Sequence, residues 1–202
     1  MISNFQITCH QINVKNKGDK LELFLRIDIN IFSMILLIII TVLANFKLDK
    51  KDKINQVFLI SAIVISIEIF LETLTCIING KNGYFFRVLS YSIHFLLFSF
   101  APVLTYLWLY FIKFWVIPEN KFILKKSIVM RFPILFNFLL IIIKKKKNIV
   151  FYLDKNNIYH RGPYFYISII ITYYYIVMGF CWIITNRKKI PEEIKKTYQL
   201  LT

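Results

Sequence analysis

Two glutamates, Glu68 and Glu72, lie within a stretch that is otherwise apolar enough to cross a membrane, ISIEIFLETLTCIING (65–80). They are four residues apart, so a helix places both carboxylates on one face. Two carboxylates this close in a low dielectric do not both ionise easily, and ionisable groups in a membrane span face protein or water rather than lipid. The chemistry open to such a pair is the binding or movement of a proton, a cation or a small polar ligand.

The next apolar run supplies partners for the glutamates. The turn NGKNG (79–83) is short and rich in glycine, which predicts a tight helical hairpin. Pairing the two helices about Lys81 places Glu68 level with His94, and Glu72 level with Ser90. The expected intramembrane polar cluster therefore consists of Glu68, Glu72, Arg87, Tyr91 and His94. Two interpretations stay open: a functional site, or a structural polar cluster that holds two helices together.

Motifs for catalysis are absent from the sequence. Its five glycines form neither a phosphate-binding loop nor G-x-G-x-x-G, and H-E-x-x-H and G-x-S-x-G do not occur. His10 and His160 are too far from His94 to complete a metal site, and the three cysteines form no C-x-x-C pair, so neither zinc nor a disulfide framework is expected. We predict no catalytic residues, no cofactor, no metal and no enzymatic activity.

The composition is typical of a membrane protein. The 202 residues are 57% hydrophobic, and the net charge of +15 gathers at the ends of apolar runs, which indicates lipid head groups rather than nucleic acid as the partner. We predict an all-α membrane protein, a bundle of about five transmembrane helices (29–185) between a polar N-terminal tail (1–28) and a basic C-terminal tail (186–202). The expected spans are about 29–46, 57–78, 84–117, 128–143 and 164–185, of which the fourth is the shortest.

One segment outside the spans has a strand-like pattern. In IVFYLDKNNIYHR (149–161), alternating apolar residues flank DKNN, which predicts a short β-hairpin on the same side as NGKNG. Tyr159, His160 and Arg161 in this segment are candidates for an external, ligand-facing loop.

Three stretches resemble a known family, namely ETLTCIING (72–80), LTYLWLYFIKFWV (104–116) and FYLDKNNIYHRGPYFYI (151–167). They are similar to the N-terminal membrane-spanning region of bacterial GGDEF proteins, the diguanylate cyclases. The resemblance implies a sensory or input module that acts on cyclic di-GMP synthesis. The chain has no adjacent glycines, so the GGDEF signature is absent, and the resemblance implies a relative of a cyclase without its catalytic domain.

The resemblance also implies a bacterial plasma membrane protein with its N-terminus outside. Basic residues number 14 on the expected inner side and 12 on the outer side, which does not decide the orientation. The expected partners are the lipid bilayer and either a second copy or a signalling protein, with the ligand unknown. The alternative function is a small transporter or channel-like subunit that uses Glu68 and Glu72 for cation or proton movement.

Overall fold

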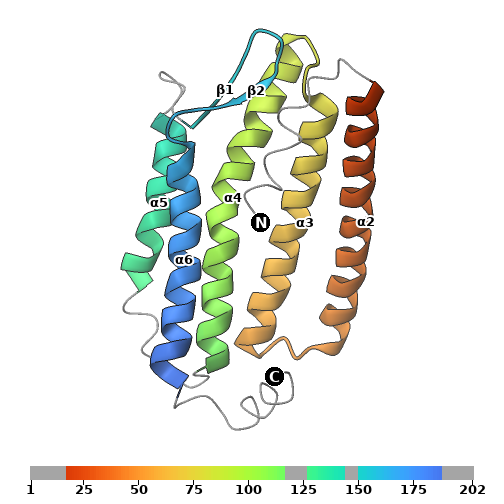
Figure 1. The fold of residues 1–202 in the computed structure, drawn as a ribbon. Helices are drawn as coiled ribbons and strands as arrows, with labels where there is room; N and C mark the ends of the chain where they lie inside the picture. Colours follow the sequence, from red (N-terminus) through yellow and green to blue (C-terminus); the bar gives the residue numbers. More distant parts are fainter. Residues whose placement is uncertain (1–16, 117–126, 144–149, 188–202) are drawn as a thin grey trace.

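A computed structural model describes residues 17–116, 127–143 and 150–187, and these form a bundle of helices with one small hairpin (Figure 1). The elements in chain order are α2 (Lys17–Lys47), α3 (Lys53–Ile78), α4 (Tyr84–Val116), α5 (Ser127–Ile143), β1 (Phe151–Leu153), β2 (Tyr159–Arg161) and α6 (Phe165–Asn186). The predicted all-α membrane bundle is confirmed.

The ends of α3 follow from local sequence. Asp52 caps its first turn, where the carboxylate accepts a hydrogen bond of 3.1 Å from the backbone N–H of Ile54. After Ile78 the chain turns through Gly80 (φ +77°) and Gly83 (φ +128°), which are conformations that side chains rarely adopt. The turn brings α4 back beside α3, as the predicted helical hairpin requires.

Four described helices are long and apolar enough to cross a membrane: α3, α4, α6 and the part of α2 from Leu23. The fourth expected span, about 128–143, does not reach this length. At 1.5 Å per residue the 17-residue α5 extends about 25 Å, less than a hydrocarbon core of about 30 Å. The first helix differs in the other direction, because α2 begins at Lys17 and includes residues that we had placed in the polar tail.

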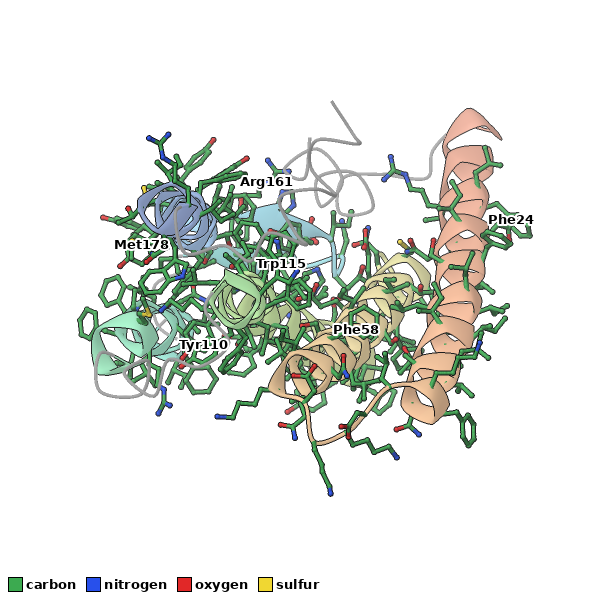
Figure 2. The ribbon with its side chains drawn as sticks, turned by 90° about the horizontal axis from the view of Figure 1, so that it is seen from below. Phe24, Phe58, Tyr110, Trp115, Arg161 and Met178 are labelled. Carbon is green, nitrogen blue, oxygen red and sulfur yellow. The ribbon has the colours of Figure 1, made fainter. Side chains whose placement is uncertain are left out.

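The helix α4 lies at the centre of the bundle, next to α3, α5 and α6 (Figures 1 and 2). The helix α2 packs against α3 at the edge, and Figure 2 shows Phe24 pointing away from the other helices, with 66% of its surface exposed. Exposed apolar side chains on the bundle's outer faces are the surface that a lipid bilayer would cover.

The predicted hairpin is also confirmed. Strands β1 and β2 pair antiparallel, with Phe151 opposite Arg161 and Leu153 opposite Tyr159. The hairpin lies at the same end of the bundle as the α3–α4 turn, because the Gly80 N–H donates a hydrogen bond of 3.2 Å to the Asn157 carbonyl.

The cysteines correct one expectation. Cys76, buried near the end of α3, is disulfide-bonded, whereas Cys181 is a free, exposed thiol. Spacing alone gave no indication of this bond. The expected tails at 1–16 and 188–202, and Ile149 at the start of the hairpin segment, lie outside the described residues.

Candidate functional site

A partly open cavity of about 140 Å³ lies where α4 meets α6, with α3 contributing Glu68 and the exposed Tyr173 lining it from α6. Most of its wall is apolar, but one carboxylate and four hydroxyl groups also line it. The lining residues are Glu68, Phe98, Ala101, Leu104, Thr105, Phe165, Ser168, Ile169, Thr172, Tyr173 and Ile176.

Glu68 is the charged residue of this wall. Its Oε1 atom is buried and accepts no hydrogen bond from the residues that the structure describes. A carboxylate held away from water without a donor is costly in a membrane-embedded bundle, so the cavity is a place where a ligand or water would be stabilised.

A polar network across three helices supports the cavity wall. Pro102 has no backbone N–H, so the Phe98 carbonyl four residues earlier lacks its helical donor. The Asn137 side chain of α5 donates a hydrogen bond of 2.9 Å to this carbonyl. The same side chain accepts a hydrogen bond of 2.7 Å from the Ser168 hydroxyl of α6. Asn137 thereby joins α4, α5 and α6 beside the cavity.

The cavity is closed along the bundle axis by packed side chains. Toward the hairpin end, the ring centroids of Phe98 and Phe151 lie 5.4 Å apart in a stacked pair. Toward the opposite end, Leu109 and Tyr175 pack together, and both are 0% exposed. The arrangement is therefore suited to holding a small molecule within the bundle.

The structure distributes the predicted polar cluster over three environments. Glu68 faces the cavity, whereas Glu72 interacts electrostatically with Arg26 of α2, an interaction that the pairing of α3 with α4 did not anticipate. Tyr91 packs on Phe151, with ring centroids 5.2 Å apart. Glu68 and Glu72 still interact electrostatically along α3, but of these three residues only Glu68 lines the cavity.

The remaining two members of the cluster lie under the hairpin. His94, 1% exposed, stacks on Tyr159 with ring centroids 4.7 Å apart, and its Nδ1 atom lies 2.6 Å from the Ser90 carbonyl oxygen. Arg87 donates a hydrogen bond of 3.5 Å to the Leu153 carbonyl of β1. Both residues therefore attach the hairpin to α4.

Asn157 fastens the hairpin to the α3–α4 turn. Its φ of +59° is left-handed, a conformation that asparagine tolerates better than most residues. Its side-chain amide donates to the carbonyls of Ile78, at 3.3 Å, and Lys81, at 3.2 Å. The Ile78 carbonyl, at the end of α3, also accepts a hydrogen bond of 3.0 Å from the backbone N–H of Lys81, so Asn157 is a second donor to it.

The hairpin residues alternate between the bundle and the surface. Tyr159 is 1% exposed, and burial raises the pKa of its hydroxyl above the ordinary value. The Arg161 guanidinium lies 4.9 Å from the Phe165 ring centroid. His160 lies on the other face, stacked on Tyr152 and 3.3 Å from the Asp154 carboxylate. Of the three candidates, two therefore face the bundle and one faces outward.

The carboxylate of Asp154 organises the hairpin turn. Its Oδ1 accepts hydrogen bonds from the backbone N–H groups of Asn156, at 2.9 Å, and Ile158, at 2.8 Å. Burial alone would raise the pKa of Asp154, but the hydrogen bonds from Ile158, His160 and Asn156 together hold that pKa below its ordinary value.

Sequence reasoning missed Asn137, Ser168 and Asn157, although Asn137 and Pro102 carried a signal. A proline within a span frees a carbonyl, and an asparagine in an apolar run needs partners. No group of three or more His, Cys, Asp or Glu among the described residues could hold a metal ion.

The fold and site define a multi-pass membrane protein with a carboxylate-containing cavity between its helices. Searches for similar family models, curated proteins and solved structures find no match for this chain.

Proposed function

We propose that this protein is a membrane-embedded sensory module that binds a small ligand in the cavity at Glu68. The observation that carries the proposal is the position of the cavity between α3, α4 and α6, with packed side chains toward both ends of the bundle. A molecule held there touches three helices at once, so its binding energy can bias their relative positions.

The direction of signalling follows from the position of the hairpin. The hairpin fixes one end of α3 and α4 through Asn157 and His94, so displacement is easier at the opposite end, where α6 finishes at Asn186. We place the hairpin outside the cell and the end of α6 inside. The disulfide of Cys76 near the hairpin end supports this orientation, because disulfides persist in oxidising compartments.

The resemblance of residues 72–80, 104–116 and 151–167 to the sensor regions of diguanylate cyclases motivates the sensory role and its proposed link to cyclic di-GMP. In this proposal the module acts through a second copy or a separate signalling protein, which would receive the movement of α6.

A second candidate function is transport of a proton or cation, and Glu68 is the observation that favours it. A buried carboxylate without a described hydrogen-bond donor is the kind of group that proton and ion carriers use. This function requires a path to both sides of the membrane, whereas aromatic and aliphatic packing at Phe98, Phe151, Leu109 and Tyr175 favours a closed site.

Distances between helix ends test the sensory proposal. Spin labels at Lys51→Cys and Arg187→Cys, in a Cys181→Ser background in nanodiscs, report on α3 and α6 at the end away from the hairpin. Filling the cavity with Ala101→Leu should shift the distance distribution by about 1–2 Å, the usual size of helix displacements in switches.

The control is Ile170→Leu, which introduces the same residue without adding volume on the exposed face of α6, where Ile170 is 64% exposed. This control should leave the distances as in the unmodified chain. If Ala101→Leu also leaves them unchanged, cavity occupancy is not coupled to the helix ends and the sensory proposal fails.

A further inference from the structure

We propose that the cavity at Glu68 is selective for a small organic cation, specifically an amine that carries a short alkyl or aryl group. This inference names the ligand class of the proposed sensory site and rests on that proposal. It follows from the hydrogen-bonding capacity, the charge and the size of the cavity.

Three of the four hydroxyl groups of the wall, those of Thr105, Ser168 and Thr172, are already committed as donors. Ser168 donates to the Asn137 side chain at 2.7 Å, Thr172 donates to the Ser168 carbonyl at 3.0 Å, and Thr105 donates to the Pro102 carbonyl at 3.0 Å. A hydroxyl has one hydrogen and two lone pairs, so each of these oxygens retains only accepting capacity. The cavity therefore favours a ligand that donates hydrogen bonds.

The charge of the wall also favours a ligand that donates hydrogen bonds, and specifically a positively charged one. Glu68 supplies a carboxylate, and the described residues that line the cavity include no basic side chain. Glu72, one turn away, is instead engaged by Arg26. A buried carboxylate without a partner destabilises its surroundings, and a positively charged donor compensates for this cost through a charge-assisted hydrogen bond.

The apolar part of the wall indicates which group the amine carries. Phe98 and Phe165 supply aromatic surface, while Leu104, Ile169 and Ile176 supply aliphatic surface. The volume of about 140 Å³ is close to that of a cavity of about 150 Å³ known to accept benzene. An amine with a phenyl ring and one methylene group fits this size.

The wall is less suited to a hard metal cation. Calcium takes about six to eight oxygen ligands at short distance, and magnesium requires a near-octahedral oxygen shell. The lining residues offer one carboxylate and four hydroxyl groups in a mainly apolar wall. An organic cation satisfies the carboxylate with its ammonium group and covers the apolar wall with its carbon atoms.

The test uses the full chain in nanodiscs, with benzylamine as the probe. Benzylamine should raise the unfolding temperature in a saturable manner, and calorimetric titration should give a dissociation constant. Benzyl alcohol and benzoate have the same ring without the positive charge, and they should bind at least about tenfold more weakly, the factor expected for losing a hydrogen bond between charged groups. Sodium chloride alone should not compete.

The variant Glu68→Gln should weaken benzylamine binding by the same factor of about ten or more. Its matched control is Glu72→Gln, which removes a carboxylate from the same helix but not from the cavity, and it should bind benzylamine as the unmodified chain does. If Glu68→Gln does not fold, Ala101→Leu provides the loss of binding by filling the cavity instead.

Equal binding of benzyl alcohol, unchanged binding in Glu68→Gln, or displacement of benzylamine by sodium ions would each overturn the inference. Absence of benzylamine binding would overturn it as well. These outcomes are separate from the sensory proposal, because the spin-label distances in Ala101→Leu test coupling between the cavity and the helix ends without any ligand.

Discussion

Replacing Asn137 by leucine should lower the free energy of unfolding of the bundle. The size of this loss should depend on Pro102 in α4. Asn137 is 1% exposed and makes two interhelical hydrogen bonds, to the Phe98 carbonyl at 2.9 Å and from the Ser168 hydroxyl at 2.7 Å. Leucine has the same branching and the same number of side-chain heavy atoms but can make neither bond. The Phe98 carbonyl then has no donor, because Pro102 cannot supply the usual helical N–H.

Interhelical hydrogen bonds in membrane proteins contribute about 0.6 kcal/mol on average and at most about 1.7 kcal/mol. For two bonds, Asn137→Leu should lower the free energy of unfolding by about 1–3 kcal/mol. In a Pro102→Ala background the N–H of residue 102 returns to the Phe98 carbonyl, so only the bond to Ser168 is lost. The cost of Asn137→Leu should then fall by about 0.6–1.7 kcal/mol, which is the coupling energy of the cycle.

The assay is reversible unfolding in bicelles for the unmodified chain, the two single variants and the double variant. As a control, Ser99→Ala removes a hydroxyl that donates at 2.8 Å within α4 to the Phe95 carbonyl, so it should show no coupling with Asn137→Leu. The reasoning is wrong if the coupling with Pro102→Ala is zero, or if Asn137→Leu costs more in that background.

Three further predictions concern packing, pH and orientation. Gly179→Ala should cost about 1–3 kcal/mol of unfolding free energy, because its Cβ would overlap the Trp108 ring, and in a Trp108→Leu background thermal unfolding should show a smaller loss. Because the pKa of Asp154 is lowered in the folded hairpin, its ionised carboxylate stabilises the hairpin fully at pH values above the ordinary aspartate pKa. This stabilisation is lost as the pH falls through the lowered, folded-state pKa. The protection of the hairpin amides against hydrogen exchange should therefore decrease over this pH range, and Asp154→Asn should remove this pH dependence of stability. A cysteine at exposed Lys155 should react with an impermeant maleimide added to intact cells, and labelling only after lysis would contradict the proposed orientation.

The helices were predictable because each apolar run is long and ends in charges or turn residues. The run around 84–117 predicted α4 to within a residue, the run around 57–78 predicted the end of α3 but not its start four residues earlier at Lys53, and NGKNG predicted their antiparallel pairing. The hairpin was predictable from DKNN and from alternation on either side of it. The start of α2 at Lys17 was not, because charged residues in 17–28 mask a helix that continues beyond the apolar run.

The site was only partly predictable. Pairing α3 with α4 placed Glu68 level with His94, and in the structure Glu68 and Phe98, one turn from His94, line the same cavity. The remaining side of the cavity is formed by α6. The periodicity of apolar residues in α6 does not predict which of its faces packs against α4. The partner of Glu72 was missed for the same reason, since Arg26 lies in a segment that we had assigned to a tail.

Flux measurements test the central claim, that Glu68 lies in a closed binding site rather than on a conducting path. The full chain is reconstituted in liposomes that contain a pH-sensitive dye, and proton and sodium gradients are imposed in turn. The account predicts fluxes equal to those of empty liposomes for both the unmodified chain and Glu68→Gln, because packed side chains close the cavity toward both ends of the bundle. A flux that the unmodified chain supports and Glu68→Gln abolishes would contradict the account and establish transport instead.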